Sequence, residues 1–184
     1  YPAGPRTFTT TITVHDVPAP AFTPSITSGC TPLAVSFTDN STPGSGTIRS
    51  IVWDFGDGNT AQGTTASHTY TVGGSFSVTT IVENSFGCKK SLTRPNLIRT
   101  DETPNVDFTA DAPGSCVTPH TVNFRATGSG AATFAWTFGD GGTSSDQFPA
   151  HTYTAEGRYN VVLTARSTLG CERVVTKPAF VAIE

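Results

Sequence analysis

Three short motifs occur twice in this chain, in the same order and with the same spacing. Trp-Asp-Phe-Gly-Asp-Gly or its close variant begins at Trp53 and Trp136, His-Thr-Tyr begins at His68 and His151, and Gly-Cys ends at Cys88 and Cys171. The differences 136 − 53, 151 − 68 and 171 − 88 are all 83. A fixed period of this kind is the signature of repeated structural units. The chain is therefore expected to fold as two homologous domains.

The domain boundaries follow from the same comparison. Upstream of the tryptophans the spacing is 86 residues, as between Cys30 and Cys116, because the loop before the first Trp is longer in the first copy. We place the first domain at residues 17–100 and the second at residues 101–184. Residues 1–16 belong to neither complete copy.

Apolar residues within each copy alternate with small or polar ones. Ile51, Trp53 and Phe55 share one face of an extended segment, and the second copy repeats the pattern through Trp136 and Phe138. A period of two indicates antiparallel strands with one buried face, and no stretch shows sustained helical spacing. Several short strands between turn signals are typical of a sandwich. The predicted fold class is all-β, with two tandem immunoglobulin-like antiparallel β-sandwiches and an extra N-terminal strand.

The ordered set of Trp-x-Phe-Gly-Asp-Gly, His-Thr-Tyr and a following Gly-x-Phe/Tyr-x-Val strand resembles the PKD (polycystic kidney disease) domain, an immunoglobulin-like module. The resemblance covers nearly the whole chain. The Gly-Cys pairs are similar to those of a cysteine-containing subset in surface proteins of Bacteroidota-type bacteria. Thr137 stands where the first copy has Asp54, which weakens any role that needs this carboxylate in both domains.

Aromatic residues are expected to form the structural core of each domain. They are Trp53, Phe55 and Tyr70 in the first copy and Trp136, Phe138 and Tyr153 in the second. Immunoglobulin-type sandwiches bury one Trp in mid-strand, and a Tyr near the start of a late strand resembles the tyrosine corner. An exposed Trp platform for sugars is the alternative, but both Trp residues alternate in phase with buried apolar neighbours.

The four cysteines divide evenly between the two copies. Their spacing fits no zinc site, and matched cysteines in a chain of this composition indicate disulfides in an oxidising compartment. Four cysteines allow three connectivities, of which the repeat favours the intradomain one. We predict bonds from Cys30 to Cys88 and from Cys116 to Cys171.

Acidic residues near the turns are the candidates for a metal site. Gly56-Asp57-Gly58 is foremost a hairpin turn, because Gly accepts positive φ without steric cost. Some PKD-like modules hold calcium, so Asp39, Asp54 and Asp57 are the calcium candidates, although no Asp-x-Asp-x-Asp-Gly loop is present. The expectation is that the chain has no metal and no other cofactor. Asn40-Ser41-Thr42 matches an N-glycosylation acceptor.

The segment 1–16 alternates Thr with apolar residues and is predicted to be a β-strand. Phe8, Ile12 and Val14 supply its apolar face. Thr11–Thr23 aligns without gaps to Leu97–Thr109, so the segment resembles the final strand of a preceding repeat. A strand cannot satisfy its own backbone groups, so it is expected to pair either with its own first domain or with a neighbouring molecule.

Charge and motif content narrow the function classes. A net charge of −3 and a pI near 5.8 argue against nucleic acid, and no apolar run is long enough for membrane insertion. No signature of an enzyme is present. The predicted function is a non-catalytic structural or adhesive module of a secreted or cell-surface protein: a spacer, or a fibre-building unit that assembles end to end. The alternative is an accessory module of a secreted hydrolase that binds polysaccharide or protein. Partners are neighbouring repeats or identical subunits, and a host or matrix ligand.

Overall fold

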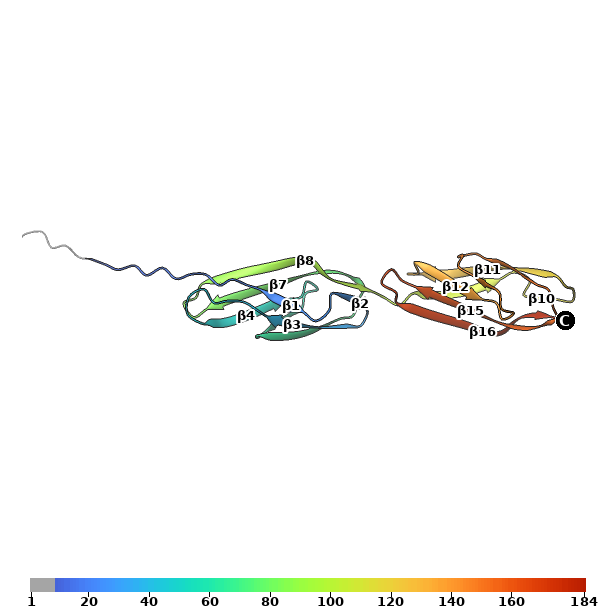
Figure 1. Ribbon diagram of the computed structural model, residues 1–184, viewed down its shortest axis with the longest axis horizontal. Coiled ribbons are helices and arrows are strands. Elements are labelled where there is room, and N and C mark those ends of the chain that lie inside the picture. The colour runs from blue at the N-terminus through green and yellow to red at the C-terminus, as the bar shows by residue number, and fades with distance from the viewer. Residues whose placement is uncertain (1–8) are drawn as a thin grey trace, which may run out of the picture. The chain divides into compact units, whose positions relative to one another are not determined.

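The computed structural model describes residues 9–184 (Figure 1). This part of the chain is built of β-strands and contains no helix, and hence none that could cross a membrane. The first repeat holds β1 (Phe22–Pro24), β2 (Ser28–Cys30), β3 (Leu33–Asp39), β4 (Ile48–Asp54), β5 (Thr60–Gln62), β6 (Thr65–Tyr70), β7 (Gly74–Asn84) and β8 (Lys89–Asp101). The second holds β9 (Asn105–Ala110), β10 (Gly114–Ser115), β11 (His120–Ser129), β12 (Thr133–Thr137), β13 (Thr143–Ser144), β14 (Ala150–Tyr153), β15 (Gly157–Arg166) and β16 (Glu172–Ile183).

Each repeat forms two sheets with the same topology. A three-stranded sheet has the order β1-β3-β6 in the first repeat and β14-β11-β9 in the second. A five-stranded sheet has the order β2-β8-β7-β4-β5 in the first and β10-β16-β15-β12-β13 in the second. β2 lies parallel to β8 and β10 parallel to β16, whereas the pairs β1–β3, β4–β5, β4–β7, β9–β11, β11–β14, β12–β13, β12–β15 and β15–β16 are antiparallel. The predicted all-β fold with two tandem immunoglobulin-like sandwiches is confirmed.

A tryptophan lies at the centre of each core. Trp53 and Trp136 are fully buried, and each makes an edge-on contact with a Phe, at 5.3 Å from Phe22 and 5.2 Å from Phe108 between ring centroids. Each indole N–H donates a 2.8 Å hydrogen bond to a backbone carbonyl ten residues further along the chain. The strand alternation therefore packs the indole faces against apolar side chains and satisfies its one polar atom.

The Gly-Asp-Gly turn after the Trp strand requires glycine at its first position. Gly56 and Gly139 have φ of +81° and +90°, and an added Cβ would lie 2.4 Å and 2.6 Å from the carbonyl oxygens of Ser77 and Asn160. Tyr153 secures this turn in the second repeat, where its hydroxyl donates to the carbonyl of Phe138 at 3.1 Å. Burial, followed by the nearby Asp140 charge, raises the pKa of Tyr153 well above its usual range, so this hydroxyl keeps its proton.

The N-terminal segment differs from the prediction. Residues 9–18 form no strand, and the first bridge to another segment is between Ala19 and Thr42. Phe8 lies outside the described residues, whereas Ile12 and Val14 are 84% and 86% exposed. An alternating pattern becomes a strand only where a partner supplies a ladder of hydrogen bonds, and the described chain supplies none here.

The compact units of the chain do not coincide with the two repeats. The first unit contains residues up to Ser25, Ser36–Ser67 and Ser77–Pro95. The second contains Ile26–Val35, His68–Phe76 and Asn96–Glu184. Short segments of the first repeat, β2 among them, therefore belong with the whole of the second sandwich in one unit.

Replacing Trp136 by Ala should lower the free energy of unfolding of the second sandwich by about 3–5 kcal/mol, because the cavity cannot be refilled. Urea unfolding followed by circular dichroism measures the loss, while fluorescence of the remaining Trp53 reports on the first sandwich. Val174→Ala, at a half-exposed position of β16, is the matched control and should change stability by roughly 0.5 kcal/mol or less. Equal stability of Trp136→Ala and the control would contradict a core role for the indole.

Candidate functional site

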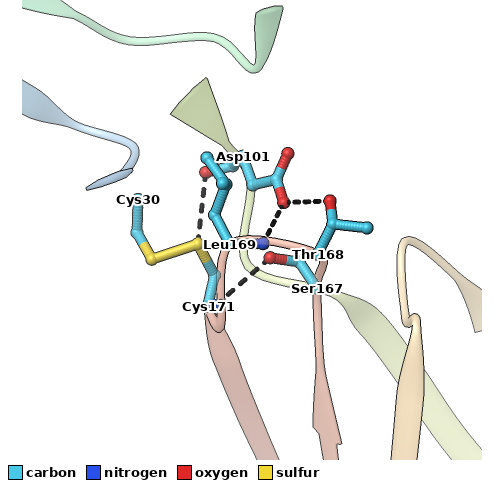
Figure 2. Close-up of a disulfide and its surroundings, with 6 residues drawn as sticks. All are labelled: Cys30, Asp101, Ser167, Thr168, Leu169 and Cys171. Atoms are coloured by element: carbon cyan, nitrogen blue, oxygen red, sulfur yellow. Dashed lines mark hydrogen bonds between the residues drawn. A yellow bond between two sulfur atoms is a disulfide. The ribbon is translucent and has the colours of Figure 1, made fainter. Parts of the chain in front are cut away.

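One disulfide is present among the described residues, and it joins Cys30 to Cys171 (Figure 2). The two Cα atoms are 5.6 Å apart, within the usual range for a disulfide, and the bond closes a sequence separation of 141 residues. Cys88 and Cys116 are free thiols. The predicted bonds from Cys30 to Cys88 and from Cys116 to Cys171 are therefore wrong, because the bond links a cysteine of the first repeat to one of the second.

The length of the last strand explains why the intradomain pairing fails. Cys30, at the end of β2, lies opposite Asp101, the last residue of β8. Cys88 directly precedes Lys89, the first residue of β8. A strand of 13 residues spans about 40 Å, whereas a disulfide needs Cα atoms closer than about 7 Å.

The second repeat separates its own cysteines in the same way. Cys116 directly follows β10, which pairs with the end of β16 through Ser115 and Ile183. Cys171 directly precedes Glu172, the first residue of β16. In both repeats, therefore, the first cysteine lies at the end of the last strand and the second lies at its beginning.

Asp101 brings Cys30 and Cys171 together through its main chain. The amide of Thr31, next to Cys30, donates to the Asp101 carbonyl at 2.9 Å. The same carbonyl oxygen lies 3.5 Å from Cys171 Sγ. The carbonyl of Asp101 thus contacts both the residue after Cys30 and the sulfur of Cys171. Figure 2 shows Asp101 beside the bond.

The side chain of Asp101 fixes the turn that leads to Cys171. Its carboxylate accepts hydrogen bonds of 2.7 Å from the Thr168 hydroxyl and from the Leu169 amide (Figure 2). Within the turn, the Cys171 amide donates to Ser167 Oγ at 3.2 Å and the Ser167 amide donates to the Cys171 carbonyl at 3.0 Å. The hydrogen bonds from Thr168, Leu169 and Ser167 hold the pKa of the Asp101 carboxyl below its usual value.

The calcium candidates are not gathered into one site. Asp39 accepts a hydrogen bond from the hydroxyl of Ser41, two residues away. Asp54 and Asp57 accept from backbone amides two residues further along the chain, at 2.9 Å and 3.1 Å. Among residues 9–184 no three His, Cys, Asp or Glu side chains are placed to hold a metal ion. These carboxylates stabilise their own turns, as Asx-type side chains commonly do.

A hydrogen bond between Asp140 and His151 was missed by the sequence interpretation. His151 Nε2 lies 2.7 Å from Asp140 Oδ2, and the imidazole ring stacks on Phe138 at 4.2 Å between centroids. Burial alone would raise the pKa of Asp140, but the hydrogen bonds from His151 and from the Gly142 amide outweigh it, so the pKa is lowered. The pair anchors the Gly-Asp-Gly turn to β14. In the sequence, the constant spacing between the two motifs was the signal that could have indicated this contact.

The chain belongs to the PKD domain family, whose family model matches residues 7–98 and 101–183. The first match includes part of the segment that we set apart from the first domain. The PKD1 domain of Vibrio anguillarum Epp is 26% identical, over 47% of this chain and 98% of that one, with a TM-score of 0.42. The PKD1 domain of the Vibrio cholerae metalloprotease PrtV is 29% identical, over 47% of this chain and 99% of that one, with a TM-score of 0.41.

Peptide mapping of the unreduced chain should recover Cys30 linked to Cys171, with Cys88 and Cys116 carrying the alkylating reagent. The two cysteines of each repeat are separated by a full strand and are therefore too far apart to bond to each other. Cys30→Ser is the control and should leave Cys171 open to alkylation. A peptide that links Cys30 to Cys88 would contradict the assignment.

Asp101→Asn should lower the melting temperature of the chain at pH 7, because the carboxylate accepts two hydrogen bonds more strongly than an amide does. The pKa of Asp101 is lower in the folded chain than the value of about 3.9 expected when unfolded. Its contribution is therefore fully present above the unfolded value and is lost as the pH falls through the folded one.

The difference in melting temperature between Asp101→Asn and the unsubstituted chain should accordingly shrink as the pH is lowered from 7 towards 2. Glu156→Gln, at an exposed position, is the control and should melt like the unsubstituted chain at both ends of this range. A difference that stays constant with pH would show that the charge of Asp101 does not stabilise the turn.

Proposed function

We propose that the chain is a non-catalytic spacer from a tandem PKD array of a secreted or cell-surface protein, and that its inter-repeat disulfide carries mechanical load. The observation behind this proposal is the bond between Cys30 and Cys171, which joins two repeats that the main chain already connects. A second covalent connection between the repeats is the feature that a load-bearing spacer would use.

The position of the bond determines the path of a force applied to the two ends of the chain. The load passes along the main chain to Cys30, crosses the disulfide to Cys171 and continues along β16. Residues 31–170 lie outside this path, although they hold both tryptophans and most of both cores. Unfolding and refolding of residues 31–170 therefore adds no length to the loaded chain.

The surroundings of the bond fit an extracellular setting. Disulfides form and persist in oxidising compartments and are rare where glutathione keeps thiols reduced. The turns that carry the two cysteines are fixed by hydrogen bonds, from the Thr31 amide to the Asp101 carbonyl and from the Leu169 amide to the Asp101 carboxylate. This arrangement supports a structural bond rather than a redox-active one.

The accessory binding role has less support from the surface. Phe86 and Phe148 are large exposed aromatic residues of the kind that a sugar platform needs. His15 stacks on Phe86 with ring centroids 3.6 Å apart, and the guanidinium of Arg125 lies 5.4 Å from the ring of Phe148. Each ring thus already has a partner on one face.

Stretching single chains by their two ends tests the proposal. The oxidised chain should extend without releasing residues 31–170, because the disulfide bypasses them. After reduction, the same chain should release an extra length of roughly 500 Å, since each unfolded residue spans about 3.3–3.6 Å and the bond closes 141 residues.

Two double variants complete this experiment. Cys30→Ser with Cys171→Ser should release the extra length without reductant. Cys88→Ser with Cys116→Ser is the matched control and should behave like the unsubstituted oxidised chain. Release of the full length from the oxidised chain would contradict the load-bearing role, and specific binding of a polysaccharide or a protein substrate would favour the accessory role instead.

A further inference from the structure

We infer that a disulfide like Cys30–Cys171 forms at each junction between neighbouring repeats of the array. Cys88 and Cys116 are then unpaired members of two further junction disulfides. Cys88 would bond to the first cysteine of a preceding PKD repeat, and Cys116 to the second cysteine of a following one. The inference rests on the proposed function, because it extends the single bond observed here to every junction of the parent array.

Cys88 lies in a turn that reproduces the turn of Cys171. The Asn84 amide donates to the Cys88 carbonyl at 3.0 Å, as the Ser167 amide does to the Cys171 carbonyl. The Cys88 amide donates to Asn84 Oδ1 at 3.0 Å, where the Cys171 amide donates to Ser167 Oγ. The preceding glycines, Gly87 and Gly170, have φ of +82° and +84°. The first turn therefore holds its thiol as the bonded turn does.

The sulfur of Cys88 also has the same main-chain neighbour as the sulfur of Cys171. Cys88 Sγ lies 4.0 Å from the carbonyl oxygen of His15, and Cys171 Sγ lies 3.5 Å from that of Asp101. His15 and Asp101 are 86 residues apart, which is the repeat spacing upstream of the tryptophans. Cys171 is only 2% exposed, whereas Cys88 is partly exposed. The position that Cys30 occupies against Cys171 is therefore open beside Cys88.

Cys116 is held as Cys30 is. Ser28 and Gly29 pair in parallel with Arg99 and Thr100, and the next pair is Cys30 with Asp101. Gly114 and Ser115 pair in parallel with Ala182 and Ile183 in the same register. The next residues in this register are Cys116 and Glu184, and Cys116 is exposed there. The first cysteine of each repeat thus lies beside the residue where the repeat ends.

The N-terminal segment gives an independent indication of a preceding repeat. Ile12 corresponds to Ile98 of β8 and, through the same alignment, to Val181 of β16. Ile98 and Val181 are completely buried, whereas Ile12 is 84% exposed. No strand of the described chain covers Ile12 as neighbouring strands cover its counterparts. A sandwich that ended with residues 9–15 as its last strand would cover Ile12 and would bring its own first cysteine to His15.

The bond at each junction forms by ordinary thiol oxidation. Two thiols lose two protons and two electrons as the sulfur–sulfur bond forms, and a small-molecule disulfide such as oxidised glutathione accepts them and becomes two thiols. The reaction proceeds through a mixed disulfide on one cysteine, which the thiolate of the other displaces. Oxidised glutathione is therefore sufficient to test the inference.

A fusion of two copies recreates the missing junction. Glu184 of a complete first copy is joined directly to Asp16 of the second, because Glu184, Asp101 and His15 occupy the same position of the repeat. Residues 9–15, which form no strand here, are thereby replaced by the end of β16. After refolding with oxidised and reduced glutathione, unreduced peptide mapping should recover Cys116 of the first copy linked to Cys88 of the second.

The Cys30–Cys171 bond inside each copy is the internal standard of this experiment. If these bonds form while Cys116 of the first copy and Cys88 of the second remain open to alkylation, the inference is overturned and the proposed spacer function stands. If the internal bonds are also absent, both fail. Cys116→Ser in the first copy should expose Cys88 of the second copy to alkylation. Cys88→Ser in the first copy, which has no partner there, should leave the new bond unchanged.

Discussion

The length of the last β-strand of each repeat determines which cysteines of this protein can form a disulfide. β8 and β16 place the two cysteines of a repeat at opposite ends, so neither repeat can close a bond on itself. The bond that forms instead joins Cys30 to Cys171 and encloses most of both sandwiches. In the chain-entropy description, a loop of 141 residues destabilises the unfolded chain by about 5 kcal/mol. Two small cores share this contribution, whereas an intradomain bond would serve only one.

The two junction positions reach the same geometry by different chemistry. At the second junction the Asp101 carboxylate binds the turn through the Thr168 hydroxyl and the Leu169 amide. At the first, His15 stacks on Phe86, the residue that corresponds to Leu169. In each repeat the contact holds the turn with the second cysteine against the segment of chain that leads into that repeat. The turn and its cysteine are thus the constant part, and the residue that secures them varies.

The sandwich fold could be predicted from the sequence because the alternation within each strand shows which of its side chains are buried. Trp53 and Trp136 alternate with neighbours that are less buried, and the Gly-Asp-Gly turns mark where the chain reverses, so the local pattern is enough. The cysteine pairing is not local, since it depends on which end of the last strand each cysteine meets. From the sequence, the two cysteines of a repeat both lie near strand ends and could be close together. Only the parallel pairing of β2 with β8 shows that they lie at opposite ends of the last strand. The alternation around Ile12 was also ambiguous, because a strand needs a partner that the described chain does not supply.

A bond at every junction would have a consequence that a single bond does not. The loop closed by Cys30 and Cys171 ends beyond Cys116, where the loop of the following junction would begin. Residues 116–171 would then lie within two loops at once, and they include Trp136 and most of the second core. Loss of the Cys30–Cys171 bond would leave residues 116–171 enclosed by the following loop, and would release only residues 89–115, which lie in no other loop. Overlapping loops of this kind explain why each repeat carries two cysteines that do not bond to each other: one faces the repeat before and the other faces the repeat after.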